Sequence, residues 1–200
     1  MGTNKLVEKW GKLPLPVSTP ALNPRFRGVR MSRVLVFDYA VPVPMPDGSV
    51  IEVLVPAGFE YDASIPNLAL VRRIAGSPYD PDLEAAACVH DWLYQTNWLP
   101  RDVADRIYLV LLRWAGVSEW RAWLHYRMLR MFGGAAYRIS DADADYIDVI
   151  TEELRNEGRD IEDFRPVVWL GKREEWRGKK EEGNTDGDGR TGTNTDGEDL

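Results

Sequence analysis

The sequence predicts an α+β fold, in which a small N-terminal antiparallel β-sheet or hairpin packs on a helical body of about four helices. Three observations carry this prediction. Two β-type segments, 33–43 and 49–55, flank a turn signal. From Asp80 onward, apolar residues recur with the three-four spacing of buried helix faces. The charged, glycine-rich end has no apolar anchor, which predicts a disordered acidic tail over residues 172–200.

The domain organisation follows from these shifts in composition. Residues 1–30 are predicted to form an extended arm, because four prolines occur there without any periodicity. A single globular α+β domain is expected over residues 31–158. Residues 159–171 are expected to add a C-terminal strand or arm through the segment 166–170.

The β part is built around one predicted hairpin. Strands 33–43 and 49–55 are joined through Asp47 and Gly48, a favoured turn pair for two antiparallel strands. Two shorter elements are expected next, a third strand or shaped loop and a short helix: 59–66 and 67–75.

The first two long helices have clear boundary signals. Asp80 is predicted to cap the first helix, with Pro81 at its first position. Pro100 is expected to start the second helix, and Gly116 to end it. A connection this short predicts that the two helices run antiparallel.

Two further helices complete the predicted helical body. Ser118 is expected to cap a third helix, Glu119–Phe132, which two glycines then end. Ser140 and Asp143 resemble a capping box for a fourth helix that runs to about residue 158.

The composition of the chain excludes several classes of protein. The net charge of −7 excludes the basic footprint of a non-specific nucleic-acid binder, so no nucleic-acid partner is expected. The single cysteine, Cys88, excludes an intrachain disulfide framework. No stretch has the length of a signal peptide or a membrane span, so synthesis in a cytoplasm is expected.

The most suggestive polar residues lie on the first two helices. His90 and Tyr94 share one helix face, with Asp91 beside them, and Asp105 lies early in the second helix. If the helices are antiparallel, Asp105 can reach the ring of His90, and Asp91 can hold a cation. That set suits a site that activates water. A buried polar clamp between two helices is the commoner role of such residues, and the residues themselves do not decide between the two.

Other polar residues carry weaker signals. Asp62 lies in the loop before the helical body, where it is a candidate metal ligand facing His90 or, alternatively, an Asx-type turn to Ser64. The tail segment 184–189 matches the first half of a calcium loop but lacks its closing glutamate. His125 is predicted to pack between helices or lie at the surface.

Serine-nucleophile, zinc and phosphate-loop chemistries lack their motifs. Three tryptophans in the second and third helices, Trp114, Trp120 and Trp123, are predicted by spacing to be core. An exposed subset of them would instead indicate a membrane-interface or partner surface.

Taken together, these residues resemble a family of phage and prophage proteins known as domain of unknown function thirteen fifty-three. The resemblance covers roughly residues 33–137. Its motifs are Val55-Pro-Ala-Gly58-Phe59, Tyr61-Asp62-Ala63-Ser64-Ile65-Pro66, His90-Asp91-Trp-Leu-Tyr94, Ala104-Asp105 and Gly116-Val117. It implies a phage or prophage origin, with synthesis in the host cytoplasm and a place in the virion as a further expectation. It implies no established activity.

A second, local resemblance bears on mechanism. His90-Asp91-x-x-Tyr94 followed by Ala104-Asp105 is similar to the paired helices of phospholipase A2 enzymes. The resemblance implies that His90 is the general base, that Asp91 binds calcium, that Asp105 orients the histidine and that Tyr94 supports the pair. The glycine-rich calcium loop of those enzymes does not precede His90, and Asp62 is the candidate replacement ligand.

The sequence is therefore compatible with two functions. The first is a phage accessory protein that acts as a calcium-dependent hydrolase of lipid or ester bonds on a phospholipid membrane surface. The second is a non-enzymatic virion, tail-associated or assembly protein that contacts other phage structural proteins and uses the His–Asp pair structurally. A reachable His90 favours the first, and a sealed His90 with arginine-bound carboxylates favours the second.

Overall fold

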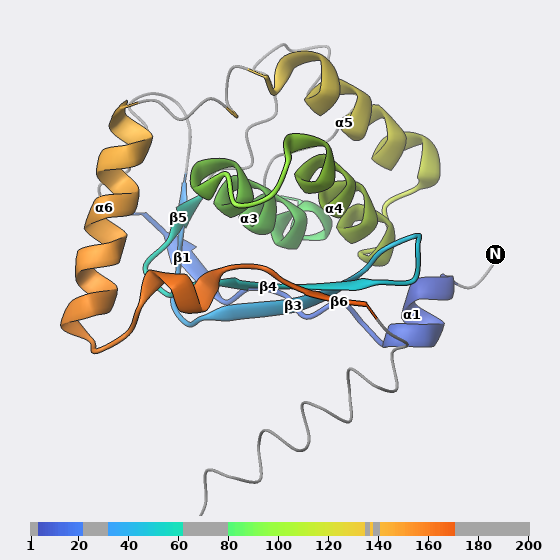
Figure 1. The fold of residues 1–200 in the computed structure, drawn as a ribbon. Coiled ribbons are helices and arrows are strands. Elements are labelled where there is room, and N and C mark those ends of the chain that lie inside the picture. The colour runs from blue at the N-terminus through green and yellow to red at the C-terminus, as the bar shows by residue number, and fades with distance from the viewer. Residues whose placement is uncertain (1–3, 22–31, 62–79, 135–136, 138–140, 171–200) are drawn as a thin grey trace, which may run out of the picture.

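The structure is a computed structural model, and it describes residues 4–21, 32–61, 80–134, 137 and 141–170. Within these residues, two three-stranded antiparallel sheets lie on one side of a helical body, which gives the α+β fold that the sequence predicts. Figure 1 shows α3, α4 and α5 above the sheets, with α6 at the flank. No helix in the described part of the chain is long and apolar enough to cross a membrane.

The predicted hairpin is confirmed. Strand β3 (Tyr39–Pro44) pairs antiparallel with β4 (Val50–Val55), with Tyr39 opposite Val55 and Pro44 opposite Val50. Gly48 adopts a φ of 91°, which a glycine tolerates without strain, and its N–H donates to the carbonyl of Met45. The sheet is thus closed at one end by a tight turn.

The long first strand expected over 33–43 is wrong, because the segment divides into two strands in different sheets. Strand β2 (Arg33–Leu35) pairs with β1 (Ser18–Pro20) and with β5 (Glu60–Tyr61). Residues 36–38 are all exposed, so the alternation of a continuous strand is broken there. Asp38 holds the break by accepting a hydrogen bond from the N–H of Ala57.

Residues 4–20 also differ from the expected extended arm, because they contain a helix and a strand packed on the domain. Helix α1 (Lys5–Trp10) is capped by the side chain of Asn4, whose amide also donates to the carbonyl of Arg113 over 2.7 Å. The indole of Trp114 donates to the carbonyl of Gly11. These contacts reach about half the chain away, which a proline count does not reveal.

The four long helices are confirmed at nearly the predicted bounds. They are α3 (Pro81–Thr96), α4 (Arg101–Trp114), α5 (Glu119–Phe132) and α6 (Asp141–Asn156). The Asp80 side chain accepts from the N–H of Asp82, as its predicted capping role requires. Ser118 precedes α5 without a side-chain capping hydrogen bond, so that predicted cap is wrong.

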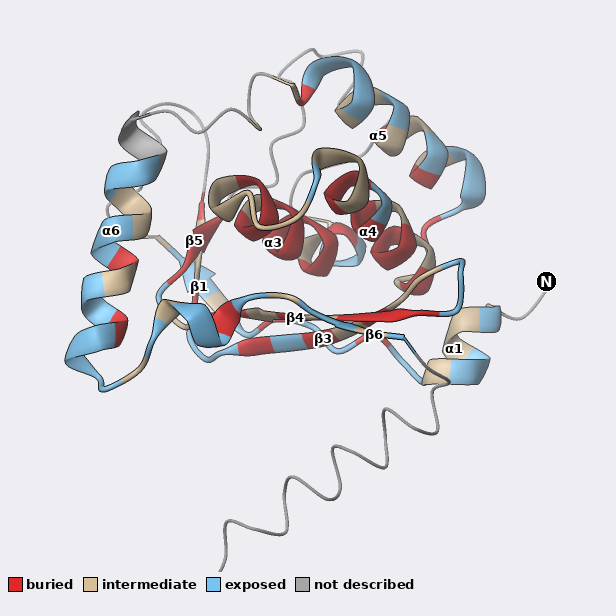
Figure 2. Cartoon of the chain, viewed as in Figure 1, coloured by how far each residue is buried: buried red, intermediate tan, exposed pale blue. Residues whose placement is uncertain are grey.

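Helix α3 is the centre of the domain. It contacts α4, α6, β4 and β5. Ten of its residues are buried, so its buried surface is wider than one stripe of residues with three-four spacing. Figure 2 shows this burial along α3 and α4, whereas α5 and α6 are mostly exposed on their outer sides. The site residues on α3 therefore lie inside the core.

The C-terminal strand is confirmed and is preceded by a short 3-10 helix that was not predicted. Strand β6 (Val167–Trp169) pairs antiparallel with β4, and the helix η1 (Ile161–Phe164) buries Phe164 edge-on against Trp92. Several predictions lie outside the described residues: Asp62, the short helix 67–75, Ser140 and the tail 172–200.

Candidate functional site

The centre of the candidate site is a contact between the two helices that the sequence pairs. Helices α3 and α4 pack together, and Nε2 of His90 lies 3.3 Å from Oδ1 of Asp105. Both side chains are buried, with His90 5% exposed and Asp105 0% exposed. The tautomer that carries its proton on Nε2 donates to this carboxylate.

Tyr94 binds the same carboxylate oxygen of Asp105. Its hydroxyl donates to Oδ1 of Asp105 over 2.5 Å, and its ring lies against His90 with 3.9 Å between ring centroids. Tyr94 follows His90 by one helical turn, so the spacing itself brings the two rings together. The structure thus brings three of the predicted site residues into one cluster.

Two arginines bind the second oxygen of Asp105. Nη1 of Arg130 on α5 donates to Oδ2 over 2.9 Å, and Nε of Arg101 lies 3.7 Å from the same atom. Arg101 also donates to the carbonyls of Leu129 and Arg130, which fixes its guanidinium between α4 and α5. Arg101 lies one helical turn before Asp105, so helical spacing brings these two side chains together, whereas no spacing in the sequence places Arg130 beside them.

Glycines make room for this arrangement where α5 ends. A Cβ atom built on Gly133 would lie 2.7 Å from the carbonyl oxygen of Leu129 and 2.9 Å from the hydroxyl oxygen of Tyr94. On Gly134 it would lie 3.1 Å from Nη1 of Arg101. The two glycines that end α5 therefore also let Tyr94 and Arg101 approach its last turn.

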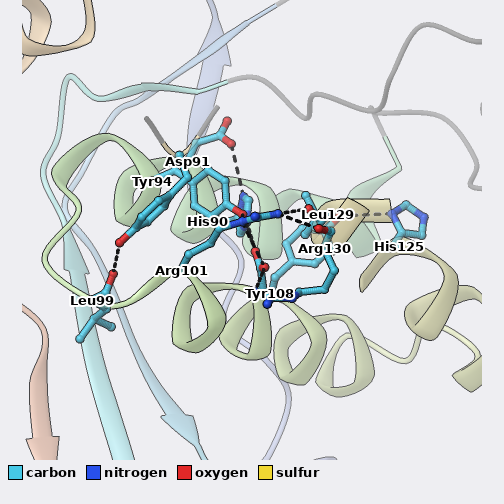
Figure 3. Close-up of polar contacts among 11 residues, drawn as sticks. His90, Asp91, Tyr94, Leu99, Arg101, Tyr108, His125, Leu129 and Arg130 are labelled. Atoms are coloured by element: carbon cyan, nitrogen blue, oxygen red, sulfur yellow. Dashed lines mark hydrogen bonds and ion pairs between the residues drawn. The ribbon is translucent and has the colours of Figure 1, made fainter. Parts of the chain in front are cut away.

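Asp91 lies on the opposite side of the imidazole. Its Oδ1 is 3.9 Å from Nδ1 of His90, which is too far for a direct hydrogen bond. The Asp91 side chain is 20% exposed, so this is the more open side of the histidine. His90 thus has the carboxylate of Asp105 in contact at Nε2 and a second, more exposed carboxylate beyond Nδ1. Figure 3 marks the second contact by the dashed line between Asp91 and His90.

A second buried histidine continues the polar cluster toward α5. The hydroxyl of Tyr108 lies 3.3 Å from Nδ1 of His125, and the Tyr108 ring packs edge-on against His90 at 5.1 Å. His125 is buried between α4 and α5, in agreement with its predicted packing role. Tyr108 therefore lies between both histidines of the chain.

The electrostatics of the cluster favour an ion pair. Burial lowers the pKa of His90, but the hydrogen bond to Asp105 and the negative charges of Asp91 and Asp105 together outweigh burial, so its pKa lies above the usual 6.5. Burial raises the pKa of Asp105, yet the hydrogen bonds from His90, Tyr94 and Arg130 outweigh it, and the pKa falls below 3.8. Burial also raises the pKa of Tyr94, so its hydroxyl stays a donor.

The described residues do not by themselves form a calcium site. No group of three or more histidine, cysteine, aspartate or glutamate side chains in the described ranges could hold a metal ion. Calcium takes six to eight oxygen ligands, and Asp91 supplies one carboxylate. Asp62, the other predicted ligand, lies outside the described residues, so calcium binding stays a prediction.

The tryptophan prediction is corrected in part. Trp114 is buried as expected, but Trp120 and Trp123 are exposed. The reason is that α5 packs on α4 through another face, where Ala122 and His125 are buried. Three-four spacing occurs on both faces of α5, so spacing did not reveal which face lies inward.

Comparison with known proteins gives one match. No curated protein and no solved structure matches the chain. Residues 38–129 match the model of a family described as protein of unknown function (DUF1353). This segment contains β3, β4, α3, α4 and most of α5, and so includes His90, Asp91, Tyr94 and Asp105. The match thus supports the resemblance to this domain family over the segment that carries the candidate site.

Proposed function

We propose that the protein is a hydrolase of ester bonds in phospholipids, with His90 as its general base. The observation that carries the proposal is the contact of Nε2 of His90 with Asp105, which directs the lone pair of Nδ1 toward the more exposed side of the ring. A histidine whose far nitrogen is fixed by a carboxylate is a recurrent arrangement for proton abstraction. The lipid substrate comes from the phospholipase A2 resemblance, and the phage origin from the family resemblance.

The proposed reaction uses water as the nucleophile. A water molecule between Nδ1 and the substrate attacks the ester carbonyl carbon, and its proton passes to Nδ1. Asp105 stabilises the resulting imidazolium through Nε2–H. The tetrahedral intermediate then collapses, and the proton on Nδ1 passes to the departing alkoxide. The products are a fatty acid and a lysophospholipid, and His90 returns to its neutral form.

Tyr94 and Arg130 are positioning residues in this scheme. Both hold Asp105, at Oδ1 and Oδ2 respectively, so the carboxylate keeps its place beside the imidazole. Substrate is expected to approach from the side of Asp91, because Asp105 is completely buried whereas the Asp91 side chain is 20% exposed.

The first test measures fatty-acid release from phospholipid vesicles by the wild type, His90→Gln and Asp91→Asn, with calcium and with a chelator. Wild type is expected to release fatty acid. His90→Gln should reduce the rate by about 10²–10⁴-fold, the usual contribution of a general base. Loss of the wild-type activity in chelator, together with loss in Asp91→Asn, is expected if Asp91 binds calcium.

His125→Gln is the matched control, because His125 is also a buried histidine bonded to a tyrosine of α4. It is expected to keep the wild-type rate within a few-fold, and circular dichroism of each variant checks its fold. Fatty-acid release that is equal in wild type and His90→Gln would show that His90 is not the base. No release by folded wild type under any condition would remove the hydrolase proposal.

A second function has an observation of its own. Asp105 is completely buried and binds Arg130 and Arg101 through Oδ2, and His90 is only 5% exposed, which are the features expected of a structural His–Asp pair. The feature that favours catalysis is the more open side of His90, where the Asp91 side chain is 20% exposed. Saturation of a buried carboxylate by arginines is the pattern of a polar clamp that fixes helix positions. In this alternative the protein is a non-enzymatic virion or assembly component. Inactive wild type combined with a strongly destabilised His90→Gln variant would favour it.

A further inference from the structure

The outer face of α5 is an exposed stripe of large apolar side chains and one arginine. Trp120, Trp123 and Met131 are 62%, 54% and 68% exposed, and Arg127 lies between them on the same face. Their spacing of three and four residues aligns them along the helix over about 16 Å. We call these four residues the outer face of α5.

This face points away from the rest of the domain. Helix α5 packs on α4 through its opposite side, where Ala122 and His125 are buried. Figure 2 shows α5 at the edge of the molecule, exposed along its outer side. Large indole rings left in water are costly and, when they gather on one helix face, mark an interaction surface.

The outer face joins indole rings with positive charge. The guanidinium carbon of Arg127 lies 5.5 Å from the centre of the Trp123 ring, within the range of a cation–π contact. Helix α5 contains three arginines and one glutamate, and the carboxylate of Glu119 binds Arg113 of α4. Two of these arginines are ion-paired, Arg121 with Asp80 and Arg130 with Asp105, so the positive charge on the outer face is that of Arg127.

Helix α6 carries an excess of negative charge. Between residues 144 and 156, α6 carries four carboxylates and one arginine. Figure 1 places α5 and α6 on opposite sides of the α3–α4 pair. A negatively charged surface would repel α6 and attract Arg127, which favours an approach with the outer face of α5 toward that surface.

From these observations we infer that the outer face of α5 docks on an anionic phospholipid surface, with the helix lying in the plane of the headgroups. Tryptophan is favoured at the boundary between headgroups and acyl chains, and exposed arginine is attracted to anionic headgroups. The choice of a lipid partner rests on the proposed function, since the same helix supplies Arg130 to Asp105.

A second copy of the chain fits this face less well. A twofold contact between two α5 helices would bring the exposed arginine of each copy toward that of the other. Two tryptophans and a methionine also cover much less than the roughly 800 Å² per partner of a stable protein interface. A dimer that depends on these tryptophans would therefore contradict the lipid assignment.

The test is flotation of the full chain with vesicles of phosphatidylcholine alone, and of phosphatidylcholine and phosphatidylglycerol in equal parts. Wild type is expected to bind the anionic vesicles and to bind less as salt rises. The double variant Trp120→Ser/Trp123→Ser should bind at least roughly tenfold more weakly. Arg127→Glu should weaken binding by roughly fivefold or more.

Matched controls come from exposed residues on the sheet side of the domain. Val167→Ser/Val168→Ser removes two exposed apolar side chains of β6, and Arg165→Glu reverses an exposed charge beside them. Both are expected to bind anionic vesicles as wild type does. Binding that is equal in wild type and in the tryptophan variant would overturn the inference. So would a wild-type dimer that Trp120→Ser/Trp123→Ser converts to monomer.

The outcome for docking can be separated from that for catalysis. His90 is buried away from the outer face, so His90→Gln should bind vesicles normally even where it releases no fatty acid. A tryptophan variant that fails to bind vesicles should still cleave a dispersed short-chain ester. Docking without any hydrolysis would support the surface and remove the hydrolase proposal, whereas hydrolysis without docking would do the reverse.

Discussion

His90 is held between two carboxylates of different character. Asp105 is buried and carries donors from Tyr94 and Arg130, whereas Asp91 is partly exposed and lies beyond Nδ1. Burial opposes a charge on the imidazole, but the two carboxylates together outweigh burial and raise its pKa above 6.5. The neutral form that a general base requires is therefore populated only at a pH above this raised value.

The titration of His90 can be followed directly. NMR of the ring Cε1–H signal should give a pKa above 6.5 for wild type, and Asp91→Asn should lower it because one of the charges that raise it is lost. The signal is assigned with His125→Gln. A His90 signal that titrates below 6.5 in wild type would contradict the proposed effect of the two carboxylates.

The raised pKa of His90 also makes the free energy of unfolding depend on pH. Because the folded protein binds the His90 proton more tightly than the unfolded chain, this stabilisation is present below about pH 6.5. It is lost as the pH rises through the raised pKa of the folded state. The free energy of unfolding of wild type relative to His90→Gln should therefore be larger at pH 6 than at pH 9, as measured by urea denaturation.

At the scale of elements, the end of α5 is where helix packing and the candidate site depend on each other. The last turn of α5 offers two carbonyls to Arg101, and Arg130 of the same turn reaches Asp105. Gly133 has a φ of −71°, so its backbone would accept any residue. What requires glycine is the close approach of Tyr94 and of the carbonyl of Leu129.

Gly133→Ala is accordingly expected to destabilise the protein by about 1–3 kcal/mol, because a Cβ atom would overlap the Leu129 carbonyl and the Tyr94 hydroxyl. Gly134→Ala is the milder comparison, since its Cβ would lie 3.1 Å from the guanidinium of Arg101 and within 4 Å of no backbone atom. Thermal denaturation of both variants measures the difference. Equal stability of the two would show that the last turn of α5 adjusts without cost.

The elements also show where sequence patterns were informative. Helix boundaries were predicted within a residue or two, because Asp80, Pro81 and Gly116 act through local backbone geometry. The split of 33–43 into β2 and β3 was not predictable, since it depends on pairing with Phe59 and Gly58 across the chain. The inward face of α5 was missed because its tryptophans repeat as regularly as its buried residues.

The candidate site was likewise predictable only where helical spacing or the pairing of neighbouring helices places its residues. The contact of His90 with Asp105 follows from two antiparallel helices and was predicted, as was the nearness of Tyr94 at one helical turn. Arg130 was missed because it comes from a third helix, and the crossing of α5 over α4 is set by packing rather than by any spacing in the sequence. Asp62 remains a predicted ligand outside the described residues.

At the scale of the whole molecule, the core extends beyond the segment that matches the family. Ile150, Leu154 and Phe164 are buried in the same cluster as α3 and β4, although all three lie after residue 129. Tyr146 adds a hydrogen bond from the N–H of Glu60 to its hydroxyl. The matched segment therefore carries the candidate site, and the C-terminal elements complete its support.

Phe164→Ala tests this support. Its ring is buried against Trp92, so the substitution should cost about 3–5 kcal/mol of unfolding free energy. Phe37→Ala removes an equally large ring that is 65% exposed and should cost less than about 1 kcal/mol. Chemical denaturation compares the two. Similar losses would mean that η1 rests on the domain without stabilising it.

The pairing of β6 with β4 has a practical consequence for studying this protein on surfaces. Val167–Trp169 runs along the sheet, on the side of the α3–α4 pair away from α5 (Figure 1). An attachment point engineered after Leu170, which is 89% exposed, would tether the molecule by its sheet side. The tryptophan-bearing helix would then face the flowing solution, and a biosensor prepared in this way would present it to injected liposomes in one defined orientation.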